Sequence, residues 1–206
     1  MNLVESYTDY DDREFDRFEY VSMEVSETIF SNCKFKGCDF HETEFIHCRF
    51  NECSFEACNL NLIKLQDCSF RDVTFDGCKL VGINWLAADW PRKGLHSKSP
   101  INFSKCQLDY STFIGLHLPK VKFKECSLKD IEFSDANLEG GDFSGSTLSL
   151  SRFNNTNLNQ CNFEGAKEYK INLLRNKISK AKFSLPEAYS LIHHLEEIVL
   201  IEDTVS

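Results

Sequence analysis

The sequence predicts an all-β solenoid with a four-sided cross-section, and two observations carry this prediction. Phe or Leu recurs at every fifth residue over most of the chain. A small or β-branched residue, often Cys, stands two places before each of these central residues, as Cys38 does before Phe40. A fixed internal period of this kind is typical of a solenoid, in which each unit stacks on its neighbours.

The first array of five-residue units extends from about residue 15 to residue 90. Of the 18 Phe residues in the chain, 17 stand at a central position, and all ten Cys residues stand at a small-residue position. Such a distribution does not arise by chance. The central residues of this array are Phe15, Tyr20, Val25, Phe30, Phe35, Phe40, Phe45, Phe50, Phe55, Leu60, Leu65, Phe70, Phe75, Leu80, Trp85 and Trp90.

Residues 91–100 interrupt the period with a turn-rich, basic segment bounded by Pro91 and Pro100. We expect it to project from the surface as a short loop. Its basic residues, Arg92, Lys93 and Lys98, are candidates for contact with a partner protein or with DNA bound to it. A neutral bulge that absorbs the change of phase is an equally good interpretation.

The second array, residues 101–183, alternates Phe and Leu at its central positions, as in Phe123, Leu128, Phe133 and Leu138. With four units per turn, Phe would lie over Phe on two opposite walls and Leu over Leu on the other two. With three units per turn, Phe would lie over Leu at every level. Ladders of identical residues allow offset ring stacking, so we predict four units and 20 residues per turn. About eight turns at the spacing of β-strands give a rod about 40 Å long.

After Phe163 the pattern weakens, and residues 184–206 are predicted to form a C-terminal α-helix. Ser184 and Glu187 have the spacing of a capping box, and Pro186 would stand in the first helical turn. This helix could plug the open end of the solenoid or join two chains in a homodimer, and the length of its apolar face favours the homodimer. The apolar residues at helical spacing are Leu185, Ala188, Leu191, Ile192, Leu195, Ile198 and Val199.

The cysteines are predicted to be core residues. With four units per turn, Cys38, Cys58 and Cys78 stack in one column, where thiols behave as small hydrophobic groups. No His falls on an inward position, so a mixed Cys/His zinc site has no second type of ligand, and we expect neither a metal nor a cofactor. Free thiols indicate a reducing compartment. The chain has no apolar run long enough for a bilayer and no signal peptide at its acidic start, so we expect a cytoplasmic protein without membrane contact.

The net charge of −9 is unevenly distributed. Residues 1–30 carry −7 and residues 184–206 carry −5, which leaves +3 for the residues between them. This balance argues against direct binding of nucleic acid. Two groups of acids could bind a protein partner or simply keep the solenoid soluble. They are Asp9, Asp11, Asp12, Glu14, Asp16 and Glu19 near the start, and Asp130, Glu132, Asp135, Glu139 and Asp142 in the second array.

Nothing in the sequence favours catalysis. The six His residues are predicted to lie on the outside, in the loop or on the C-terminal helix, without a nucleophile beside them. The chain has no glycine-rich phosphate loop, and solenoid walls offer no deep pocket. The sequence therefore predicts a binding protein and not an enzyme.

Triplets such as Cys38-Asp39-Phe40, Ala136-Asn137-Leu138 and Cys161-Asn162-Phe163 resemble the repeat of the pentapeptide-repeat proteins, over about residues 15–183. This resemblance implies a right-handed, four-sided β-helix. The chain length, the single break after Trp90 and the tail of residues 181–188 are similar to the topoisomerase-protecting branch, which contains quinolone-resistance, albicidin-resistance and microcin-immunity proteins.

That branch implies a dimeric rod, joined at the C-terminal helices, that imitates duplex DNA. Such a rod binds DNA gyrase or topoisomerase IV and relieves poisoning by a drug or toxin. The charge of +3 in the middle of the chain confines any mimicry to particular faces or to the ends. The alternative is a scaffold that uses the same coil with a different protein partner, because a fold does not specify a function.

Overall fold

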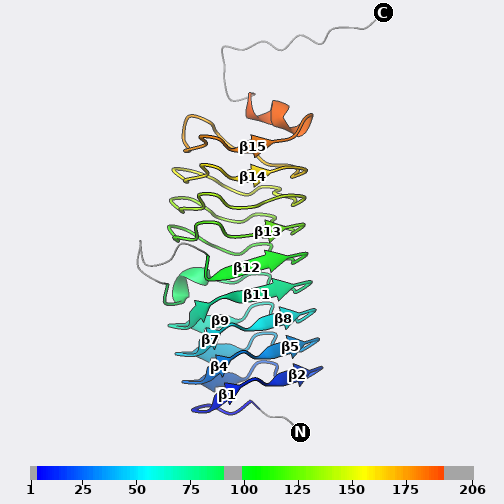
Figure 1. The fold of residues 1–206 in the computed structure, drawn as a ribbon, viewed down its shortest axis with the longest axis vertical. Coiled ribbons are helices and arrows are strands. Elements are labelled where there is room, and N and C mark those ends of the chain that lie inside the picture. Colours follow the sequence, from blue (N-terminus) through cyan, green and yellow to red (C-terminus); the bar gives the residue numbers. More distant parts are fainter. Residues whose placement is uncertain (1–3, 91–98, 193–206) are drawn as a thin grey trace, which may run out of the picture.

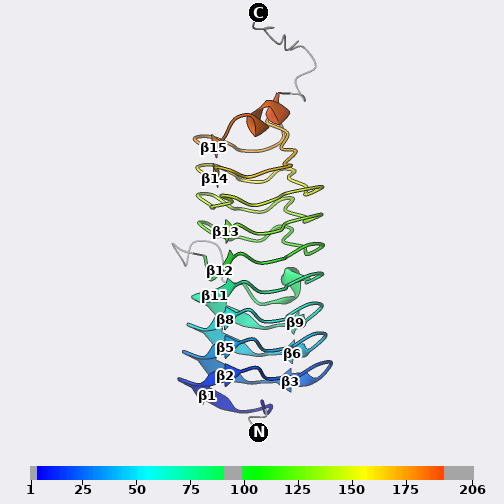
Figure 2. The same cartoon turned by 90° about the vertical axis from the view of Figure 1, so that its right-hand side faces the viewer.

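In the computed structural model, residues 4–90 and 99–192 are described. The chain winds into a rod-shaped β-solenoid of about eight turns, with its two ends at opposite ends of the rod (Figures 1 and 2). The predicted all-β solenoid is thereby confirmed. Within the first array, paired strands are in parallel register exactly one repeat of 20 residues apart, as Phe15 is with Phe35. Four five-residue units therefore make one turn.

The strands are short and form four parallel sheets, each stacked along the rod. One sheet contains β1 (Asp9–Asp11), β4 (Ile29–Ser31), β7 (Arg49–Asn51) and β10 (Ser69–Arg71). The largest contains β2 (Glu14–Asp16), β5 (Lys34–Lys36), β8 (Ser54–Glu56), β11 (Val73–Asp76), β12 (Ile101–Ser104) and β13 (Phe123–Lys124). The others contain β3 (Glu24–Ser26), β6 (Glu44–Ile46) and β9 (Lys64–Gln66), and β14 (Asn162–Phe163) and β15 (Lys182–Phe183).

The central residues fill the interior as ladders of like on like. The ring of Phe35 stacks on that of Phe55 with centroids 4.5 Å apart, and Phe123 stacks on Phe143 at 5.3 Å. These residues are almost fully buried. Parallel strands are about 4.8 Å apart, which is close to the contact distance of two stacked rings, so one ring per turn fills the column without gaps.

The small-residue positions combine packing with hydrogen bonding. Each of these side chains lies beside the backbone of the turn before it, and the thiol of Cys38 donates to the Phe15 carbonyl at 3.3 Å. The hydroxyl of Thr156 makes the equivalent bond to the Phe133 carbonyl at 2.9 Å. All ten Cys residues are free and buried. The predicted role of the thiols as core residues is therefore confirmed.

Alkaline pH is expected to destabilise the fold through these thiols. Burial raises the pKa of Cys161 from 9.0 to about 12. The protonated thiol therefore stabilises the folded state fully below pH 9, and this contribution is lost as the pH rises towards 12. At pH 10 the loss from this one thiol is about 1.4 kcal/mol.

The Cys161→Ala variant should therefore lose less stability than the wild type between pH 7.5 and pH 10. Urea denaturation at both pH values measures the difference. An equal loss in the two proteins would contradict the assignment. Ala is a suitable replacement because Ala136 and Ala166 already fill buried small-residue positions of the same array.

The break between the arrays leaves the internal stacking intact. Trp90 stacks on Phe70 with centroids 5.8 Å apart, and Phe103, the next central residue, stacks on Phe75 at 5.2 Å. Trp90 and Phe103 are 13 positions apart, which is eight more than one unit. The phase shift seen in the sequence is therefore an eight-residue insertion in a single turn. The predicted loop at residues 91–98 lies outside the described residues.

The prediction of a capping box at the C-terminus is wrong. The described part of this segment contains a short 3₁₀ helix, η2 (Glu187–Leu191), which follows Pro186 and has no side-chain cap. The Ser184 hydroxyl instead accepts from the Gly165 N–H at 3.1 Å, and a Glu187 carboxylate oxygen accepts from the Glu168 N–H at 2.6 Å. The last turn of the solenoid has no further turn to pair with, so these two side chains satisfy its N–H groups. Figure 1 shows η2 above β15, at the C-terminal end of the rod.

Candidate protein-binding surfaces

The first group of acids, which we call the N-terminal carboxylates, lies on the first turn of the solenoid. Asp9 and Asp11 belong to β1, Glu14 and Asp16 belong to β2, and Asp12 stands in the turn between these strands. Strand alternation explains their exposure, because Tyr10 and Phe15 occupy the inward positions between them. All six carboxylates, including that of Glu19, are solvent-exposed.

Most of the N-terminal carboxylates keep their charge uncompensated. Glu14 pairs with Lys36 at 3.0 Å, and Asp11 accepts a hydrogen bond from the Asn32 amide at 3.3 Å. The structure gives the other four side chains no ion pair with any described residue. They are Asp9, Asp12, Asp16 and Glu19. Glu19 lies in register with Asp39 of the next turn, which adds negative charge at this end of the rod.

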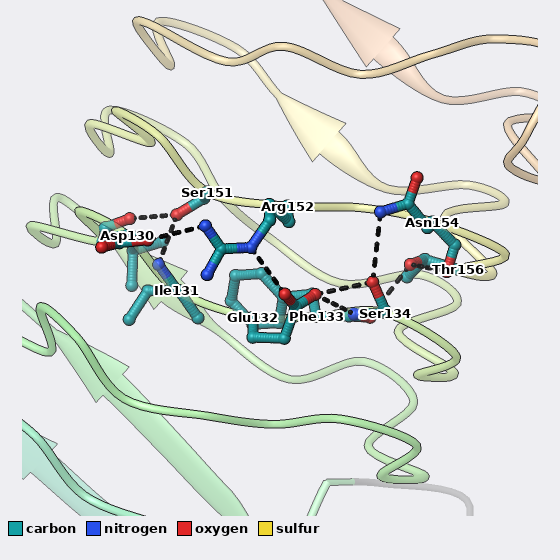
Figure 3. Close-up of polar contacts among 10 residues, drawn as sticks. Asp130, Ile131, Glu132, Phe133, Ser134, Ser151, Arg152, Asn154 and Thr156 are labelled. Carbon is teal, nitrogen blue, oxygen red and sulfur yellow. Dashed lines mark hydrogen bonds and ion pairs between the residues drawn. The ribbon is translucent and has the colours of Figure 1, made fainter.

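The second group of acids, the second-array carboxylates, is organised differently. Arg152 donates from Nε to Glu132 at 2.6 Å and from a terminal nitrogen to Asp130 at 2.9 Å (Figure 3). Glu132 also accepts from the N–H and the hydroxyl of Ser134, at 3.1 and 2.6 Å. Burial opposes ionisation of Glu132, but the bonds from Ser134 and Arg152 outweigh it and lower its pKa. One guanidinium therefore neutralises much of the charge of two carboxylates.

The remaining members of this group make hydrogen bonds to the next turn. Asp135 accepts from the Asn155 amide at 2.7 Å, and Asp142 accepts from the Asn162 amide at 3.2 Å. Glu139 accepts from the Asn157 amide at 3.3 Å. These bonds join residues about one turn apart, so the second-array carboxylates stabilise the stacking of turns and present fewer free acceptors to a partner.

The other predicted contact residues are only partly described. Arg92, Lys93 and Lys98 of the loop, and Leu195, Ile198 and Val199 of the tail, lie outside the described residues. Within η2, Leu191 is only 7% exposed and belongs to the core of the solenoid, whereas Leu185 is 71% exposed. Ala188 and Ile192 are half-buried. The described part of the tail therefore covers the last turn, and dimerisation stays a prediction.

Searches for other kinds of site give little. Within residues 4–90 and 99–192, no three His, Cys, Asp or Glu side chains are grouped so that they could hold a metal ion. No helix in that part of the chain is long and apolar enough to cross a membrane.

The repeat itself identifies the family. The family model for the pentapeptide repeat region matches residues 28–113 and 98–163, which is more than half of the chain. The chain belongs to the pentapeptide-repeat family. No curated protein matches the sequence of this pentapeptide-repeat protein.

Among solved structures, the fold of this pentapeptide-repeat protein is similar to that of QnrB1, which is described as a plasmid-mediated fluoroquinolone resistance protein. Two trypsin-treated QnrB1 variants each match with 19% sequence identity and a TM-score of 0.61. Each alignment covers 93% of this chain, with 97% of one QnrB1 chain and 98% of the other. At this level of identity the similarity concerns the fold.

Proposed function

We propose that this pentapeptide-repeat protein is a non-catalytic binding protein that protects DNA gyrase or topoisomerase IV from a topoisomerase poison. In this proposal the N-terminal carboxylates occupy a positively charged surface of the enzyme that otherwise binds duplex DNA. The likeness of the fold to a fluoroquinolone resistance protein supports this class of function.

The observation that carries the proposal is the contrast between the two groups of acids. Four of the six N-terminal carboxylates have no ion pair among the described residues, whereas Arg152 compensates two of the second-array carboxylates. Uncompensated charge at one end of a rod produces a strong local potential, which attracts a basic surface and speeds association. The N-terminal end of the rod is therefore the part that enters the enzyme.

The test is supercoiling of relaxed plasmid by purified gyrase and relaxation by topoisomerase IV, each titrated with this protein with and without a fluoroquinolone. The decisive variant is Asp9→Asn/Asp12→Asn/Asp16→Asn/Glu19→Gln, which removes four charges and keeps the side-chain shapes. We expect it to need about tenfold more protein, or higher, for the same protection, because charged rims mainly set the rate of association. The effect of the wild type should weaken as salt is added.

The matched control is Asp130→Asn/Glu132→Gln, which changes acids already neutralised by Arg152. It should protect the enzyme nearly as well as the wild type. Equal loss in both variants would show that general acidity, and not the N-terminal end, is responsible. No effect of the wild type on either enzyme would reject the topoisomerase proposal and leave a scaffold with a different partner.

A further inference from the structure

One corner of the solenoid carries large apolar side chains in an unfavourable backbone conformation. Leu62, Tyr110 and Leu150 have positive φ values of 58°, 63° and 60°. They are also exposed, by 46%, 54% and 60%. Side chains with a Cβ are disfavoured in this left-handed region, which Gly, Asn and Asp enter most readily. Neither packing nor backbone preference explains these residues, which we call the apolar edge.

The three residues of the apolar edge lie above one another along the rod. The Leu62 N–H bonds to the Val81 carbonyl at 2.9 Å, and the Gly82 N–H to the Asp109 carbonyl at 2.9 Å. These bonds place residues 62, 82 and 110 at the same corner of three successive turns, and the same pattern continues to residue 150. Gly82 leaves room for its neighbour, because a Cβ there would lie 2.7 Å from a Leu62 methyl carbon.

Beside the apolar edge, the wall formed by β3, β6 and β9 is hollowed into an acidic groove of about 1050 Å³. Figure 2 shows these strands stacked on one side of the rod, with η1 (Trp85–Ala87) beyond β9. Leu62 and the half-exposed Met23 line the groove together with Glu24, Glu42 and Glu44. Lys64 pairs with Glu44.

The charge of the acidic groove is mostly uncompensated. Glu24 and Glu42 accept hydrogen bonds from the neutral hydroxyls of Ser26 and Ser22, at 2.7 and 3.0 Å. Glu42 also lies 3.4 Å from a ring nitrogen of His41. The groove is therefore negative and has an apolar side, a combination that complements a segment with basic and apolar faces.

We propose that the acidic groove and the apolar edge together bind a basic amphipathic α-helix of a protein partner. Members of the apolar edge are two turns apart, or about 10 Å at the spacing of parallel strands. Seven residues of an α-helix rise about 10.5 Å, so apolar residues at that spacing contact Leu62, Tyr110 and Leu150 in turn. Lys or Arg side chains of the same helix pair with Glu24 and Glu42. This surface is separate from the N-terminal carboxylates, and the inference does not rest on the topoisomerase proposal.

The test measures binding of a fluorescein-labelled Leu/Lys peptide by fluorescence anisotropy with the full chain. The peptide places Leu at helical spacing, and a second peptide of the same composition has its Leu residues scrambled so that no apolar face forms. The variant is Leu62→Asn/Tyr110→Asn/Leu150→Asn. Asn adopts the left-handed conformation readily, so the urea midpoint should stay equal or rise while the Kd for the amphipathic peptide increases about tenfold or more.

The control variant is Ala57→Asn, at an exposed position with φ of 52° on another corner, and it should bind as the wild type does. Unchanged binding by the triple variant would overturn the proposal, as would equal binding of the scrambled peptide. A wild-type dimer that the triple variant dissociates in sedimentation velocity would also overturn it, because a second copy would then occupy this surface.

Discussion

Replacement of Phe133 by Ala is expected to lower the free energy of unfolding by about 3–5 kcal/mol. Phe133 is fully buried and stacks on Phe113 and Phe153, with centroids 5.4 and 5.0 Å away. It also meets the edges of Phe123 and Phe143, at 5.6 and 5.9 Å. The backbone ladders above and below hold the turns apart, so the walls cannot collapse into the cavity. The urea midpoint measures the effect.

The matched control is Phe133→Leu. Leu is the central residue of the two neighbouring columns, for example at Leu128 and Leu138, so its shape is compatible with this interior. We expect it to lose less than about 1.5 kcal/mol. A nearly unchanged midpoint for Phe133→Ala would mean that the ring does not contribute to the core as the ladder requires.

Trp85→Ala is expected to have a similarly large effect, about 3–5 kcal/mol, at the joint between the two arrays. Trp85 is fully buried and stacks on Phe113 at 5.6 Å. Its indole also contacts Phe75 below and Phe103 above. Loss of the indole therefore weakens the packing of the first array on the second. Urea denaturation followed by the fluorescence of Trp90, the second Trp in the chain, measures the loss.

Trp85→Phe separates the loss of packing from the loss of the indole itself. The indole N–H of Trp85 is buried and finds no hydrogen-bond partner among the described residues. Phe removes this unsatisfied donor and matches the ring of Phe113 in the same column, so the two effects partly offset each other. A loss below about 1.5 kcal/mol is expected. A loss as large as that of Trp85→Ala would show that the indole N–H makes an essential contact.

The candidate surfaces could be predicted only in part. The position of the N-terminal carboxylates follows from strand alternation, since each acid flanks an inward aromatic residue. The neutralisation of Asp130 and Glu132 was missed, although a signal existed: the 20-residue repeat places Arg152 directly above Glu132. The apolar edge was also missed. Leu62 and Tyr110 are 48 positions apart, and only the eight-residue insertion brings this separation to two full turns.

The sequence by itself determined the solenoid, its 20 residues per turn and the inward set of residues. This is because two of every five side chains must be buried, and a repeated local pattern leaves the backbone only one way to bury them at every turn. The tertiary structure decided which charges remain free, how the stack continues past the insertion, and how the last turn is covered. These features depend on contacts between residues in different turns, and exposed polar side chains follow no period that would reveal their partners.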